Sequence, residues 1–198
     1  TRAAMAEDYL FGDGLYQNWV DCYPAIRKDL YFVMDDSWDI PKDVNDSPNP
    51  YLGCVELSSD RFPSFRGDAV ERLKQLSEHI KSKGWKGVGG WICAQKAETH
   101  AAIPEEEYWK RRIKAANAAG FDYWKVDWGK EDRNGEWRRK LTAIGKRYAP
   151  HLYIEHALQN EFIEFSDVFR TYDVENITAQ PITIRRICDL LPYKTVEG

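Results

Sequence analysis

The sequence contains no long hydrophobic run and no glycine-rich phosphate motif. A membrane-spanning helix needs a run of about 18 or more apolar residues, and none occurs, so we predict no membrane span. Neither a G-x-G-x-x-G motif after the first apolar run nor a Walker phosphate loop is present. Both motif absences argue against a nucleotide-binding open sheet.

An excess of charge of one sign is also lacking. The 198 residues include 28 Lys and Arg against 32 Asp and Glu, a net charge of -4 with both signs interspersed. There is no basic stripe or basic tail, the feature through which nucleic acids and anionic membranes are bound. We therefore expect neither a nucleic acid nor a membrane surface as partner.

Cysteines are few and widely spaced, at Cys22, Cys54, Cys93 and Cys188. Their spacing matches no zinc pattern, and full pairing would allow three connectivities. Cys93 and Cys188 stand in apolar settings, which favours free, buried thiols at these two positions. The sequence thus predicts no metal and no cofactor.

No signal peptide is visible at the start of the chain. The sequence begins at Thr1 rather than Met, as removal or omission of an upstream segment would leave it. The sequence leaves the protein's cellular compartment undecided and favours an extracellular or periplasmic location. The oligomeric state stays open as well.

Apolar runs alternate with amphipathic segments along the chain. Short apolar runs predict strands, and apolar residues repeating every three to four positions predict helices. Repeated strand–helix units imply a parallel sheet, either open or closed as a (β/α)8 TIM barrel. The expected strands cover 29–36, 85–95, 121–129, 151–157 and 166–173, and the expected helices cover 68–84, 104–120, 135–149 and 182–191.

Polar side chains follow nearly every expected strand, at its carboxyl end. In a (β/α)8 barrel the catalytic groups come from several strand ends on one face, so this distribution favours the barrel over the open sheet. Five strands are recognisable, and a full barrel of about 250 residues has eight. We therefore predict that residues 1–198 form part of a single catalytic domain, a partial barrel whose outer strands are missing or unrecognised. The polar residues are Asp35 and Asp36, Gln95 and Lys96, Lys125 and Asp127, Glu155 and His156, and Arg170 and Asp173.

The segment FDYWKVDWG, residues 121–129, carries a lysine and an aspartate two positions apart in an aromatic run. Residues i and i+2 of a strand lie on the same face, so Lys125 and Asp127 should project together. Charged groups that face inward are costly unless they are paired or used. The pair is either a salt bridge on an edge strand or an active-site carboxylate beside a cation.

Four segments in one order carry a resemblance to a known family: FVMDDSWD, RFPSF, GFDYWKVDWG and FRTYDV. Together they resemble glycoside hydrolase clan D, which holds the α-galactosidases and α-N-acetylgalactosaminidases of families 27 and 36. The resemblance spans residues 31–191. It implies a hydrolase of carbohydrate metabolism that cleaves terminal α-linked sugars with retention, acting on an oligosaccharide or glycoconjugate.

The resemblance also implies roles for single residues. Asp127 would be the nucleophile that forms the glycosyl-enzyme, and Lys125 would bind a sugar hydroxyl beside it. Asp173 would be the general acid/base, with Arg170 near the sugar's 2-hydroxyl. A retaining mechanism needs one ionised and one protonated carboxyl group, and Lys125 would favour the ionised form of Asp127. Taken alone, Asp173 is equally well a loop-capping residue.

Four further residues would form the far side of the sugar pocket by the same resemblance. Asp35 and Asp36 would accept hydrogen bonds from ring hydroxyls, and Trp38 and Trp91 would line the pocket. Without the resemblance, the two acids could instead cap a helix or hold a metal. Adjacent strand residues point to opposite faces, so both acids can reach one ligand only if the strand ends and the chain turns.

Two positions depart from the family pattern. After the fourth strand the family has Cys-Glu or Cys-Ser followed by Trp, whereas this chain has YIEHALQ. Glu155 or His156 could contact the sugar's 2-substituent there, depending on strand register. After Asp127 the family has Gly-Cys or Asn-Cys, and Trp128 stands there instead, where it would reshape the pocket.

Two other functions stay open at this point. One is a non-catalytic barrel that only binds carbohydrate through its aromatic surface, which comprises 14% of the residues and eight Trp. The other is a metal-assisted barrel of the enolase type, in which Asp36, Asp127 and Glu155 would hold magnesium. Both candidate carboxylates, Asp127 and Asp173, are present, which favours the enzyme over the binding module.

Overall fold

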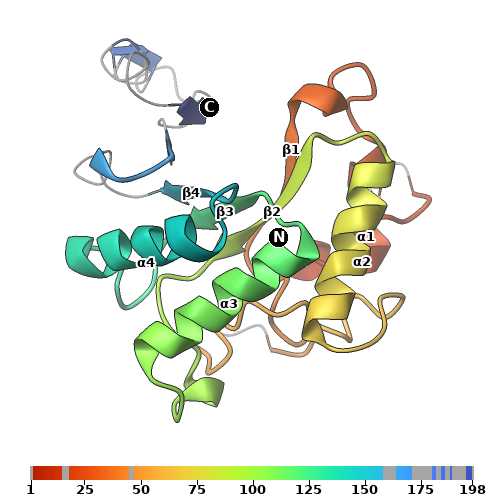
Figure 1. Ribbon diagram of the computed structural model, residues 1–198. Helices are drawn as coiled ribbons and strands as arrows, with labels where there is room; N and C mark the ends of the chain where they lie inside the picture. The colour runs from red at the N-terminus through yellow and green to blue at the C-terminus, as the bar shows by residue number, and fades with distance from the viewer. Residues whose placement is uncertain are drawn as a thin grey trace.

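A six-stranded parallel sheet forms the centre of the molecule (Figure 1). The structure, a computed structural model, describes residues 2–14, 18–44, 47–157 and 164–170, together with 180–181, 184–185, 188 and 195–197. The strands follow one another in the sheet in chain order, each parallel to the next. They are β1 (Tyr31–Met34), β2 (Gly87–Ile92), β3 (Tyr123–Val126), β4 (Tyr153–His156), β5 (Val168–Arg170) and β6 (Thr195–Glu197).

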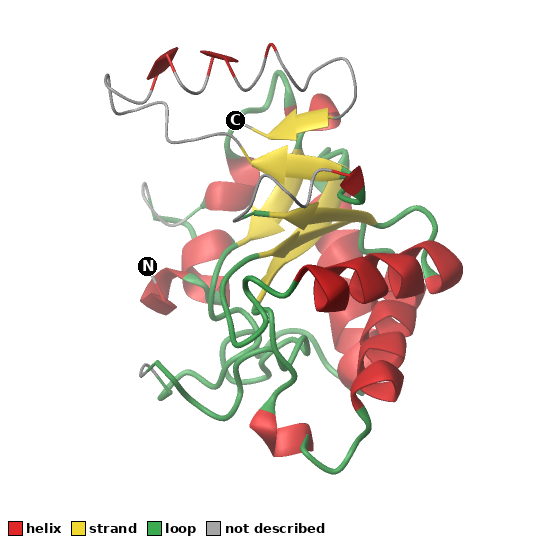
Figure 2. Ribbon diagram, turned by 90° about the vertical axis from the view of Figure 1, so that its left-hand side faces the viewer, coloured by secondary structure: helices red, strands yellow, loops and turns green. Residues whose placement is uncertain are grey.

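Three long helices connect the strands: α2 (Ala69–Ser82), α3 (Glu105–Ala119) and α4 (Gly135–Tyr148). Specific residues fix the ends of two of these helices. Asp68 caps α2 by accepting hydrogen bonds from the N–H groups of Val70 and Glu71, and Gly120 ends α3 in the left-handed conformation. Figure 2 shows these helices on one side of the sheet. Short helices complete the fold: η1 (Arg2–Ala4), α1 (Glu7–Leu10), η2 (Trp19–Asp21), η3 (Arg27–Asp29) and η4 (Glu98–His100).

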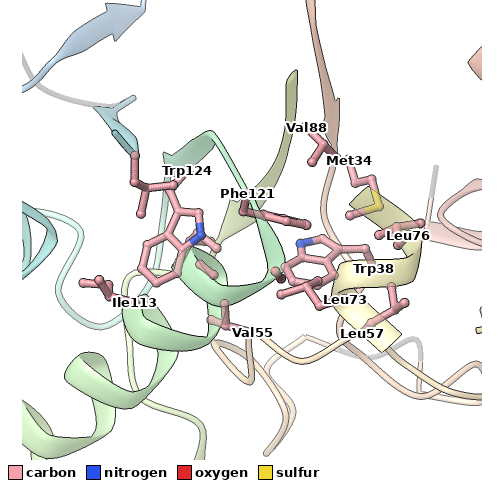
Figure 3. Packing of buried hydrophobic residues seen from close by; sticks show 14 of the residues in the cluster. Met34, Trp38, Val55, Leu57, Leu73, Leu76, Val88, Ile113, Phe121 and Trp124 are labelled. Atoms are coloured by element: carbon pink, nitrogen blue, oxygen red, sulfur yellow. The ribbon is translucent and has the colours of Figure 1, made fainter. Parts of the chain in front are cut away.

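The main core lies between the sheet and these helices, and Trp38 is part of it (Figure 3). Its side chain is 0% exposed, packs against Phe121 with ring centroids 6.0 Å apart, and lies against Gly90, where a Cβ would come within 2.9 Å of the indole. The expectation that Trp38 lines a pocket is therefore wrong. The chain leaves β1 at Met34 and turns at Ser37, whose φ is +86°, and this turn directs the indole under the sheet.

The C-terminal part of the chain differs from expectation in two ways. Strand β6 was not predicted, because three residues with one apolar side chain give no periodicity. Cys188 is free but exposed, not buried, and Ile184 is 61% exposed. Cys93 is free and buried as predicted, and Cys22 and Cys54 are free as well.

No helix in the described part of the chain combines the length and the hydrophobicity that spanning a membrane would require.

Candidate active site

The strand register brings three of the predicted site residues into one row. Trp91 of β2 pairs with Lys125 of β3, and Lys125 pairs with Glu155 of β4. Residues in register on neighbouring parallel strands point to the same face of the sheet. This face is opposite to the one that packs on the helices, because the alternate residues Ile92, Val126 and Ile154 belong to the main core.

Asp127 follows β3 directly, two positions beyond Lys125. Its backbone N–H donates to the carbonyl of Ile92 at 3.0 Å, which extends the pairing with β2 by one residue. Its carboxylate Oδ2 accepts a hydrogen bond from the indole Nε1 of Trp91 at 2.9 Å. The carboxylate is half-buried, so it is held in place and still reachable.

Lys125 is half-buried on the same face, and among the described residues it forms no ion pair with Asp127 within 4.0 Å. Strand β3 lies between β2 and β4, so it is not an edge strand. A salt bridge on an edge strand therefore does not describe this pair. Lys125 precedes Asp127 by two positions on the same face of the sheet, so its ammonium group is available to donate to a ligand bound there.

Trp91 is fixed on three sides. Its ring packs against that of Trp128 with centroids 5.3 Å apart, and its carbonyl accepts the indole N–H of Trp38 at 2.8 Å. It belongs to a small second core with Ile40, Leu52 and Cys93 and is 2% exposed. Its indole N–H donates to Asp127, and almost none of the ring is exposed. Trp91 therefore orients the carboxylate and offers a ligand little surface.

The two candidates on β4 face opposite ways. Glu155 lies in the row with Lys125, is 0% exposed, and accepts a hydrogen bond from the hydroxyl of Tyr123 at 2.8 Å. His156 points to α4, where its ring contacts Arg138 at 3.1 Å and Thr142 at 2.8 Å. Burial and the nearby Arg138 lower the pKa of His156 to about 3, so its ring is neutral. His156 therefore does not face the inner side of the sheet.

Asp35 and Asp36 stand after the end of β1, where the chain turns. Asp35 is exposed, and its N–H donates to the sulfur of Met5 at 3.2 Å. Asp36 is half-buried and accepts a hydrogen bond from the Ser37 hydroxyl at 3.1 Å. Because the strand ends before both acids, the condition for both to reach one ligand is met.

Asp39 is a buried acid that sequence patterns do not single out. It is 3% exposed, and its Oδ2 accepts the backbone N–H of Val55 at 2.8 Å, while its Oδ1 has no partner among the described residues. Burial raises the pKa of Asp39 to about 7, and the charge of Asp36 adds to the effect. Val55 has a φ of +54°, rare for a β-branched residue, so Asp39 stabilises a strained loop.

Cys93 follows β2 directly, and β2 lies between β1 and β3 in the sheet. Its thiol donates to the carbonyl of Trp128 at 3.2 Å. Burial raises the pKa of Cys93, and the charges of Asp39, Asp36 and Asp127 add to this effect. Strands β1 and β3 both pair with β2, so the acids that follow β1 and β3 flank the carboxyl end of β2.

Part of the predicted site lies outside the described residues. Asp173 is not described, and for Arg170 only the backbone, the last residue of β5, is. Two hollows of the described part are not lined by Asp127. One of about 430 Å³ lies between α3 and α4, and one of about 370 Å³ lies beside β1. The residues that follow β4 and β5 in the chain, 158–163 and 171–179, lie outside the described ranges.

The ligand set for a metal-assisted mechanism is not assembled in the described part of the chain. No group of three or more His, Cys, Asp or Glu side chains there is placed to hold a metal ion. Asp36, Asp127 and Glu155 therefore do not form the magnesium site of the enolase-type alternative. Glu155 is turned to Tyr123.

No protein-family model matches the sequence, and neither does any curated protein. The fold is similar to that of a GH27 β-L-arabinopyranosidase from Geobacillus stearothermophilus, with a TM-score of 0.67 and 14% identity, over 99% of this chain and 57% of that chain. A variant of that enzyme in complex with arabinose has a TM-score of 0.67 and 16% identity, over 95% of this chain and 56% of that chain.

These similarities define the fold: the chain is a partial (β/α)8 barrel, as predicted, and spans about 57% of the length of the first of these enzymes. An α-galactosidase I from Mortierella vinacea is also similar, with a TM-score of 0.49 and 21% identity, over 78% of this chain and 41% of that chain.

Proposed function

We propose that this chain carries the catalytic centre of a retaining glycoside hydrolase for terminal α-linked sugars of the galactoside type. Asp127 is the nucleophile, and Asp173 is the general acid/base. The observation that carries the proposal is the Asp127 carboxylate, held by the indole N–H of Trp91 at a barrel strand end and preceded on the same face by Lys125. The similarity to GH27 enzymes supports it.

The geometry suits a nucleophile. The indole N–H binds Oδ2, which leaves Oδ1 to attack the anomeric carbon. Asp173 donates a proton to the leaving oxygen as the C–O bond breaks, then takes a proton from the water that displaces Asp127. In retaining enzymes the two carboxyl groups are about 5 to 5.5 Å apart, which is the separation expected between Asp127 and Asp173.

The sugar is recognised at both ends in this proposal. Lys125 lies on the same face two positions before Asp127 and offers a cation to a ring hydroxyl, whereas Glu155 is 0% exposed and bound by the Tyr123 hydroxyl, so it is left out. Asp35 and Asp36 bind the hydroxyls farthest from the anomeric carbon, and Trp128 and Arg170 line the remaining sides. His156 is left out, because it faces α4.

A β-L-arabinopyranoside is a second candidate substrate. One of the similar structures is a β-L-arabinopyranosidase, and another is a variant of that enzyme in complex with arabinose. This sugar has the ring configuration of an α-galactoside without the hydroxymethyl group. The nucleophile and the acid/base would be the same for both substrates, and only the far end of the pocket would differ.

The test of the nucleophile is Asp127→Gly, assayed on aryl α-galactosides and aryl β-L-arabinopyranosides. The variant should lose turnover on both, because no group remains to form the glycosyl-enzyme. Added azide should then restore activity on an activated aryl glycoside. It fills the space of the carboxylate and displaces the aryloxide, giving a glycosyl azide of inverted configuration.

The matched control is Asp122→Gly, a change at the aspartate just before β3. The carboxylate of Asp122 forms an ion pair with Lys81, with an N–O distance of 2.8 Å, and takes no part in the site. It should gain nothing from azide. An Asp127→Gly variant that turns over substrate at the wild-type rate would refute the assignment. Binding of the sugar without any turnover by the wild-type protein would favour the carbohydrate-binding barrel instead.

A further inference from the structure

A buried arginine behind the sheet contacts the backbone of the candidate nucleophile. Arg138 lies in the first turn of α4, and its side chain is 0% exposed. Its Nη2 donates to the carbonyl of Asp127 at 2.5 Å, and its Nη1 donates to the carbonyl of Val126 at 2.9 Å. Its Nε donates to the carbonyl of Asp132 at 2.9 Å, in the loop that follows. One guanidinium thus binds three carbonyls along the end of β3 and the β3–α4 connection.

The backbone of Asp127 is therefore held on both sides. Its N–H donates to the carbonyl of Ile92 on β2, and its carbonyl accepts from Arg138. With both backbone groups bound, the direction of the Cα–Cβ bond is fixed. The indole of Trp91 then fixes the carboxylate at the other end of the side chain.

A second set of contacts holds the arginine itself. Nδ1 of His156 lies 3.1 Å from Nη1 of Arg138, and an arginine can only donate, so Nδ1 is the acceptor. Burial lowers the pKa of His156 to about 3, so the neutral ring carries its proton on Nε2. Nε2 then donates to the Thr142 hydroxyl at 2.8 Å, and that hydroxyl donates to the carbonyl of Arg138 at 3.1 Å.

We propose that Arg138 is a positioning residue for Asp127, which it orients through the backbone while His156 and Thr142 hold the guanidinium in place. A buried arginine is costly, and burial lowers the pKa of Arg138 to about 10, although the charges of Asp127 and Asp132 oppose the shift. Lysine could carry the same charge, but it could not donate in three directions from one plane. The role assigned to Asp127 rests on the proposed function.

The test compares Arg138→Lys with Arg139→Lys, a matched change at the exposed neighbour that pairs with Glu164. The first readout needs no substrate: the NMR signal of the Trp91 indole N–H, identified by its loss in Trp91→Phe. This proton binds the Asp127 carboxylate, so it reports where the carboxylate stands. Arg138→Lys should shift the signal, and Arg139→Lys should leave it in place.

The second readout is kinetic. If Asp127 is the nucleophile, a small displacement should lower kcat by about 10²-fold, with a smaller effect on KM. Arg139→Lys should keep the wild-type values. A folded Arg138→Lys variant with an unchanged Trp91 signal overturns the proposal, and so does an unchanged kcat in an active enzyme.

Arg138→Lys could also fail to fold, in which case Thr142→Val decides. It removes the hydroxyl that holds His156 and keeps a similar shape, so it should shift the Trp91 signal in the same direction by a smaller amount. An unchanged signal in this variant overturns the proposal. Absence of any glycosidase activity in the wild-type protein would refute the proposed function alone, since the NMR readout tests Arg138 without it.

Discussion

Asp39 shows how burial sets the protonation state of a single residue. Its folded pKa of about 7 lies above the ordinary 3.8, so the folded protein keeps this proton to a higher pH than the unfolded chain does. The stability that the proton provides is fully present below pH 3.8 and is lost as the pH rises to about 7. The slope can reach about 1.4 kcal/mol per pH unit.

Replacing Asp39 by Asn should remove this dependence. The amide oxygen can still accept the N–H of Val55, and the amide carries no charge at any pH. Asp39→Asn should therefore be more stable than the wild type at pH 8, with a smaller difference at pH 5. Urea unfolding at the two pH values measures this.

The control is Asp8→Asn, at an aspartate whose side chain is 83% exposed. It should follow the wild-type pH dependence. A larger stabilisation by Asp39→Asn at pH 5 than at pH 8 would contradict the predicted sign.

Sequence patterns could place some of these residues and not others. The alternation rule put Lys125 and Asp127 on one face, because Lys125 lies in a regular strand and Asp127 continues its pairing with β2. Trp38 and Asp39 follow a turn with positive φ at Ser37, beyond which alternation predicts nothing. Arg138 stands beside the exposed Arg139 in a charged helix segment, and no local signal distinguishes the two.

At the scale of elements, β2 is the strand on which the site depends, and its glycines are required by packing. A Cβ on Gly89 would come within 2.4 Å of the Tyr123 carbonyl oxygen, which belongs to the backbone of β3. A backbone atom in a central strand cannot move aside. Gly89→Ala should therefore destabilise the protein by about 2 to 3 kcal/mol, measured as the free energy of unfolding in urea.

Gly84→Ala provides the comparison. A Cβ on Gly84 would have no atom within 4 Å, and the φ of this residue is +94°, so alanine there meets backbone strain alone. The cost should be about 1 kcal/mol. Equal effects of the two substitutions would show that crowding at β2 is not what requires glycine.

The elements themselves were largely predictable. The three long helices have apolar periodicity, and the first five strands are short apolar runs. The end of β1 at Met34 was harder to predict. Asp35 and Asp36 continue the expected strand in the sequence but do not pair with β2. The helix expected at 182–191 stays a prediction, since its bounds lie outside the described residues.

For the whole molecule, the site predicts independence from metal ions. The candidate chemistry needs two carboxyl groups and water, and the described part of the chain offers no metal-binding cluster. Prolonged treatment with a chelator should leave both the glycosidase rate and the melting temperature unchanged. A rate that falls with chelator and returns with added magnesium would instead support the enolase-type alternative.

The order of the sheet has a consequence for biosynthesis. From β2 onward, each described strand pairs with the one made before it, so it finds a partner that has already left the ribosome. When β3 emerges, β2 and α2 are already available for it to dock on. The carbonyl of Asp127, however, finds Arg138 only after the first turn of α4 has been added. The candidate nucleophile should thus be synthesised early and set in its final orientation about a dozen residues later, at roughly one second of translation.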